Sequence, residues 1–84
     1  MALRRKVERV LTESFPPPAK VRVEDHDGIY GSVVSNRFKR MEMVERQNLI
    51  GETLAGRLNQ DELRHIQFIV GFTPEEAAAQ TGAG

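Results

Sequence analysis

The apolar residues of this chain fall into blocks that switch between the repeat of a helix and the alternation of a strand. Because every element must bury its apolar face against another one, the order of these blocks limits the folds open to 84 residues. The first block predicts a helix over residues 2–14, whose apolar stripe comprises Leu3, Val7, Val10 and Leu11. Proline lacks a backbone N–H, so the prolines at 16–18 end this helix.

A β-hairpin is predicted next, over residues 20–35. Apolar and polar residues alternate in 20–25, and a second strand follows over 29–35. The tripeptide His26-Asp27-Gly28 between the two strands is a turn signal of the Asp-Gly type. Residues 36–40 then form a connection to the second half of the chain.

The second half predicts a long helix and a third strand. Residues 42–58 keep an apolar face on a helical repeat, and residues 59–62 break that pattern, with room for a short helical turn. Residues 65–72 read as a strand, on which side chains alternate between two faces. We expect His65 and Gln67 on one face, and on the other the hydrophobic residues Ile66, Phe68, Val70 and Phe72.

The last element is predicted from its capping residues. Thr73 is placed to cap a helix, Pro74 to occupy its first position and Glu76 to close a capping box, which predicts a helix over residues 74–80. The order of elements is therefore αββαβα. We expect an α+β fold with a three-stranded sheet and helices packed on one face, in a single domain over residues 1–80 with a flexible tail at 81–84.

Composition excludes several classes of function. The chain has no cysteine, so it offers no disulfide and no thiolate ligand. No apolar run is long enough to span a bilayer, and residues 1–9 lack the apolar core of a signal peptide, so we expect a soluble, cytoplasmic protein. The net charge is zero, which argues against a dedicated nucleic-acid binder. No arrangement of residues indicates a catalytic site, and we expect no enzymatic activity.

Three candidate binding features remain. His65 is the only histidine in the second half of the chain, and its plain interpretation is a surface residue with a local hydrogen bond. His26 has a plain interpretation as a turn residue between two aspartates. A basic cluster is a candidate for contact with phosphates or a partner, or is a solvated loop partly neutralised by nearby glutamates; it comprises Arg37, Lys39, Arg40 and Arg46.

Several segments resemble the BolA-like family. Residues 34–38, Val-Ser-Asn-Arg-Phe, are similar to the family's V-S-x-x-F, and residues 44–50 are similar to its v-x-R-H-R-x-V segment. His65 falls on the histidine of the family's (I/V)-H-A-L motif, and residues 72–76 resemble its closing x-T-P-x-E-W. The resemblance covers about residues 3–78, in the family's order and spacing, and implies a class II KH-like topology.

The resemblance also implies a function. Proteins of this kind pair with monothiol glutaredoxins as heterodimers and share a [2Fe–2S] cluster that is held with glutathione, with no tightly bound cofactor when isolated. His65 takes the position of the family's histidine ligand, and a second ligand comes from the loop between the first two strands, where His26 lies. Imidazole suits iron, and histidine replaces cysteine on one iron of some [2Fe–2S] centres. Whether His26 or a solvent ligand completes the site stays open.

Two alternative functions remain at this point. The family has also been linked to transcriptional regulation, and a DNA-binding regulator would use the KH-like surface with the basic cluster. Binding of that kind would be weak and steeply dependent on salt. The other alternative is an interaction module that binds no metal. The chain alone is expected to be a monomer or a weak homodimer.

Overall fold

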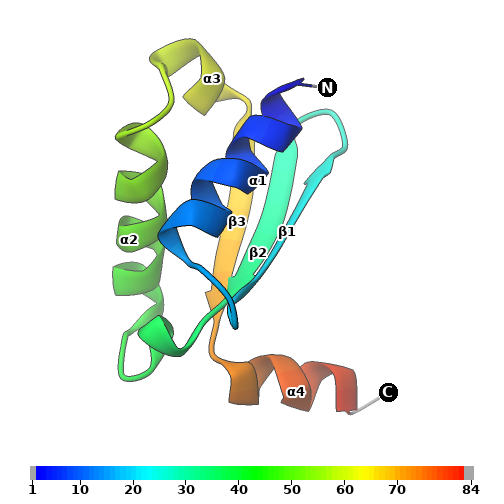
Figure 1. Cartoon of the computed structure of the whole chain (residues 1–84), viewed down its shortest axis with the longest axis vertical. Coiled ribbons are helices and arrows are strands. Elements are labelled where there is room, and N and C mark those ends of the chain that lie inside the picture. The colour runs from blue at the N-terminus through cyan, green and yellow to red at the C-terminus, as the bar shows by residue number, and fades with distance from the viewer. Residues whose placement is uncertain (1, 83–84) are drawn as a thin grey trace.

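The computed structural model describes residues 2–82, which form four α-helices and a three-stranded sheet (Figure 1). The elements are α1 (Ala2–Ser14), β1 (Lys20–Asp25), β2 (Ile29–Val34), α2 (Met43–Ala55), α3 (Gln60–Arg64), β3 (Ile66–Phe72) and α4 (Pro74–Gly82). A short 3-10 helix, Asn36–Phe38, lies in the connection after β2. The predicted α+β class and its αββαβα order are confirmed, with α3 as one added turn of helix between α2 and β3.

The sheet has the order β1-β2-β3 and is mixed. β1 and β2 pair as the antiparallel hairpin that the Asp-Gly signal predicted, and β2 and β3 run parallel. A parallel pair needs a long crossover, which here is made by the 3-10 helix, α2 and α3. The crossover and α1 cover one face of the sheet, while α3 and α4 lie at opposite ends of the molecule (Figure 1).

The core lies between that face and the two covering helices. The apolar stripe of α1 is buried as its spacing predicted, and Ile50 and Leu54 of α2 meet the same core. Phe15 and Phe38 are both buried in the core and lie 5.4 Å apart between ring centroids. α1 ends at Ser14, just before Phe15 and the prolines, as the sequence predicted.

Residues that cap the helices explain where the later elements begin. The Thr73 hydroxyl accepts a hydrogen bond from the Glu76 N–H at 3.1 Å, and the Glu76 carboxylate accepts one from the Thr73 N–H at 2.8 Å. The predicted capping box of α4 is therefore confirmed. Asn59 and Glu62 form the same reciprocal pair at the start of α3. α4 continues to Gly82, beyond the predicted end at residue 80, and the rest of the predicted tail, residues 83–84, lies outside the described residues.

The face assignment predicted for the third strand is wrong. The pairing shifts between Ile29 and Tyr30, so that Ile66 lies opposite Ile29 and Phe68 opposite Tyr30. One extra residue, Gln67, is thereby inserted into β3, and such a bulge reverses the alternation beyond it. As a result Ile69 and Gly71 face the core, whereas Phe68, Val70 and Phe72 lie on the opposite face. His65 also precedes the strand and is the C-cap of α3.

Gly71 is required by the packing of the core. A β-carbon at this position would lie 2.9 Å from the ring of Phe38, whose side chain is fully buried. We expect Gly71→Ala to lower the free energy of unfolding by about 1–3 kcal/mol, because the buried ring has little room to move. Urea unfolding followed by far-UV circular dichroism measures this change.

The matched control is Gly51→Ala on the exposed side of α2, where a β-carbon would meet nothing within 4 Å. That substitution should raise the free energy of unfolding by about 0.5–1 kcal/mol, because alanine restricts the unfolded chain and favours a helix. Equal stability of the two variants would contradict the packing that we describe around Phe38.

Candidate functional site

His65 is held by its backbone and presents a free side chain. Its N–H donates to the Glu62 carbonyl at 3.1 Å, and its carbonyl accepts from the Ile29 N–H at 2.7 Å, which joins the end of α3 to the start of β2. The imidazole is exposed and has no hydrogen bond or ion pair with any residue in the described part of the chain. The backbone therefore fixes the position of a ring whose two nitrogens remain available.

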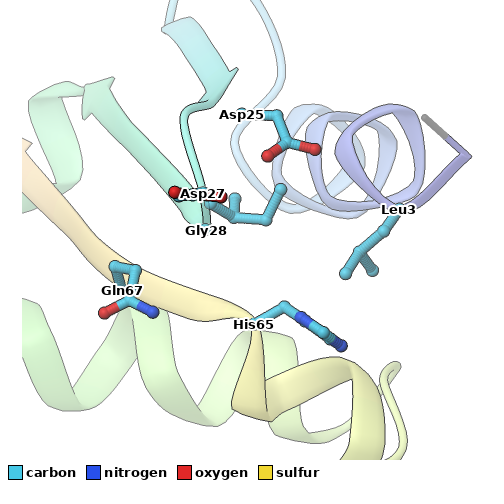
Figure 2. Close-up of a pocket in the computed structure, with 7 residues that line it drawn as sticks. Leu3, Asp25, Asp27, Gly28, His65 and Gln67 are labelled. Atoms are coloured by element: carbon cyan, nitrogen blue, oxygen red, sulfur yellow. The ribbon is translucent and has the colours of Figure 1, made fainter.

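A pocket of about 310 Å³ opens beside this ring, at the end of the sheet where β3 begins. The β1–β2 turn supplies its opposite wall, and α1 contributes one apolar residue. In Figure 2 the ring of His65 and the side chain of Leu3 project toward the same space, and Asp25 lies across from them. The residues labelled there are Leu3, Asp25, Asp27, Gly28, His65 and Gln67, and Ile29 completes the lining.

The turn brings two carboxylates to this pocket. Asp25 pairs with Ile29 and so lies on the core side of the sheet, at the end of β1. Asp27 and Gly28 both have positive φ angles, of 58° and 141°. Glycine is needed at residue 28, since an added β-carbon would collide with the side chain of Gln67. One sequence signal for this site was missed: Asp25 occupies an inward position of an otherwise alternating strand.

His26 is not among the residues that line the pocket. Its Nε2 lies 2.8 Å from the Glu24 carboxylate, and both side chains are largely exposed. The pKa of Glu24 is lowered, first by this hydrogen bond and then by the charge of Arg22. The structure thus holds the two histidines in different surroundings, with His65 at the pocket and His26 paired to the neighbouring strand residue.

The basic cluster predicted from the sequence is largely engaged within the protein. Arg46 is buried, with only 8 % of its side chain exposed, and Arg37 donates to the Ser14 carbonyl at 3.1 Å and lies over the Phe15 ring. Lys39 lies 3.4 Å from the Glu75 carboxylate. Arg40 is exposed and makes no ion pair with the described residues. The four cations therefore do not form one open basic surface.

Arg46 organises the end of β3. Its guanidinium donates to the Met41 carbonyl at 3.0 Å, to the Gly71 carbonyl at 3.2 Å and to both oxygens of Glu76 at 2.6 and 3.2 Å. These bonds join α2, β3 and α4 through one side chain. The hydrogen bond from Arg46 is the main cause that lowers the pKa of Glu76 to about 2.

The pocket can supply part of a metal site but not a whole one. Among the described residues, no three histidine, aspartate or glutamate side chains come together in a way that would hold a metal ion. The available donors at the pocket are one imidazole and two carboxylates, and there is no thiolate. One imidazole and two carboxylates supply only part of a coordination shell, so a metal or cluster bound here would need further ligands from another molecule.

Two solved structures share this architecture. The BolA domain of SufE1 from Arabidopsis thaliana matches with a TM-score of 0.73 and 25% sequence identity, over 90% of this chain and 96% of that one. The chain has the fold of a BolA domain, which supports its resemblance to the BolA-like family. BolA1 from Arabidopsis thaliana also matches the fold, with a TM-score of 0.68 and 24% identity, over 88% of this chain and 94% of that one.

No family model and no curated protein matches the sequence. The resemblance to BolA-like proteins therefore rests on the three-dimensional arrangement together with the motifs around His65 and Thr73. None of the helices within residues 2–82 has the length and apolar character needed to cross a membrane.

Proposed function

We propose that this BolA-like protein is a non-enzymatic partner of a monothiol glutaredoxin in the trafficking or regulation of iron–sulfur clusters. In this proposal the two proteins share a [2Fe–2S] cluster, and glutathione and the glutaredoxin provide the thiolate ligands. The cluster is cargo that passes through the complex, and the isolated chain holds none tightly. We place this activity in the cytoplasm.

The observation that carries the proposal is the free imidazole of His65 at the pocket. A ligand must be unprotonated at the metal and held in position, and the backbone hydrogen bonds on either side of His65 provide that position. A bridging cluster would need only one or two ligands from this side, and His65 with one group of the β1–β2 turn would supply them.

The second ligand is proposed to come from the β1–β2 turn. The Nε2 atom of His26 is hydrogen-bonded to Glu24 and His26 does not line the pocket, whereas Asp25 and Asp27 do. Asp27→Asn keeps the side-chain shape at a position with a positive φ angle, which asparagine tolerates, and so removes only the charge.

The proposal is tested by titrating the protein into a cluster-loaded monothiol glutaredoxin with glutathione, while visible circular dichroism is recorded. We expect a changed spectrum that saturates at equal amounts of the two proteins. Parallel titrations with His26→Ala, Asp25→Asn and Asp27→Asn identify the second ligand, which is the residue whose loss alters the spectrum. No complex and no spectral change with the unmodified protein would refute the proposal.

The DNA-binding alternative has less support from the contacts described above. Of the four cations that it would use, Arg46 is buried, and Arg37 and Lys39 have partners within the protein. Binding to phosphates would require these contacts to be exchanged. No specific contact or pocket favours this alternative, and we do not propose it.

A further inference from the structure

The sheet has a second face, which α1 and α2 do not cover. Strand pairing places its side chains in three rows, because directly paired residues share a face. The row nearest the β1–β2 turn is Glu24, Tyr30 and Phe68, followed by Arg22, Ser32 and Val70, and then by Lys20, Val34 and Phe72. A sheet usually buries both faces or keeps one polar, but two of these strands carry apolar side chains outward.

Two aromatic rings stand exposed on this face. Tyr30 and Phe68 are paired neighbours on β2 and β3, and 42% and 52% of their surfaces are accessible. Aromatic side chains that are solvent-exposed and adjacent are typical of protein interfaces, where they supply large contact areas at low entropic cost. Without a partner, this pair leaves apolar surface in water.

The other end of the same face forms a groove of about 1090 Å³ against α4. Val34 and Phe72 contribute apolar surface to it, and Lys20 and Arg22 of β1 stand at its side. No acidic residue lines this groove. Arg22 forms an ion pair with Glu24, with 3.2 Å between its Nε and the carboxylate, while Lys20 makes no ion pair within the described residues. The groove is therefore apolar with a positive edge.

We propose that this face binds an amphipathic helix of another protein, with acidic residues along one side. Three strands about 4.8 Å apart span roughly the 10 Å width of a helix, and a six-residue strand extends about 20 Å. A helix of roughly 14 residues would cover that length at about 1.5 Å per residue. Its apolar side chains would cover Tyr30, Phe68 and Phe72, and its acidic side would face Lys20 and Arg22.

This surface is separate from the pocket of His65. The pocket lies on the core side of the sheet beside the N-terminal part of α1, whereas the groove lies on the uncovered face beside α4. The helix-binding proposal therefore does not depend on the proposed shared cluster, and each can fail without the other.

Tyr30 provides a built-in probe, because it is the only tyrosine and the chain has no tryptophan. The experiment titrates a synthetic helical peptide of about 14 residues, with leucines along one face and glutamates beside them, and follows tyrosine fluorescence. Chemical-shift mapping on the labelled protein locates the contact. We expect saturable binding with shifts at Tyr30, Phe68 and Phe72. The same peptide with lysines in place of its glutamates should bind at least about tenfold more weakly.

Two variants test the two components of the surface. Phe68→Ser should weaken binding by at least about tenfold, as expected for a central aromatic anchor. Lys20→Glu should remove the preference for the acidic peptide, and its matched control is Arg9→Glu, an exposed cation on α1 that should leave binding unchanged. Far-UV circular dichroism confirms that each variant is folded.

Several outcomes would overturn the proposal. These are no shifts on this face, equal binding of the acidic and basic peptides, or an unchanged preference in Lys20→Glu. A single-stranded oligonucleotide that produces the shifts when the peptide does not would assign the face to nucleic acid. Self-association that is lost in Phe68→Ser, with no peptide binding, would assign it to a second copy of the chain.

Discussion

Replacing His65 by alanine should abolish the change that this protein causes in the spectrum of a glutaredoxin-bound [2Fe–2S] cluster. The affinity of the cluster-containing complex should fall at least about tenfold, a loss of about 1.4 kcal/mol. The expected cause is the loss of the imidazole ligand, because the hydrogen bonds of His65 within the described chain are made by its backbone and survive in alanine. Visible circular dichroism of the titrated complex measures the effect.

Two further measurements separate this effect from a change in folding. The side chain of His65 is exposed, so His65→Ala should change the free energy of unfolding by less than about 0.5 kcal/mol. His65→Cys should restore a complex with a shifted spectrum, since a thiolate is an alternative ligand for iron. An unaltered spectrum in His65→Ala, with stability intact, would remove His65 from the cluster site.

Arg46→Met, which keeps an unbranched apolar side chain but removes the guanidinium, should cause a large loss of stability. The guanidinium joins three elements, and methionine leaves the carbonyls of Met41 and Gly71 without this donor. The expected decrease in the free energy of unfolding is about 2–4 kcal/mol, measured in urea. Arg9→Met on the exposed surface of α1 is the matched control and should cost less than about 0.5 kcal/mol.

The same variant should alter the dependence of stability on pH. The pKa of Glu76 is lowered from 4.5 to about 2, first by its hydrogen bond with Arg46. Because the folded value lies below the unfolded value, this carboxylate stabilises the fold fully above about pH 4.5 and loses its contribution as the pH falls toward 2. Arg46→Met and Glu76→Gln should both flatten the stability profile in that range, and glutamine can still complete the capping box. If stability in both variants depended on pH as it does in the unmodified protein, this would contradict the role of the ion pair between Arg46 and Glu76.

The elements that could be predicted from sequence are those whose signals are local. The stripe of α1, the Asp-Gly turn and the capping box at Thr73 each depend on residues within a few positions of one another, and all are confirmed. The order of these elements then led to the fold class, because a hairpin and a third strand need helices to cover their apolar face.

The features that were missed depend on contacts between distant segments. The bulge at Gln67 is set by pairing with β2, so strict alternation put Phe68 and Phe72 on the wrong face. The sequence also could not reveal that Arg46 is buried, because its acceptors come from β3 and α4, far along the chain. For the site, His65 was found from its motif, but its proximity to the carboxylates of the turn depends on how the turn folds against α1 and β3.

Pulsed electron paramagnetic resonance of the reduced shared cluster tests the central claim most directly. Only this chain would be labelled with the heavy nitrogen isotope, and the glutaredoxin and glutathione would carry natural nitrogen. We expect a strong coupling from the labelled nucleus, because an imidazole nitrogen of His65 binds one iron, and we expect it to disappear in His65→Ala. A cluster in the complex with no strong coupling to the labelled chain would contradict the proposal that this protein is a cluster ligand.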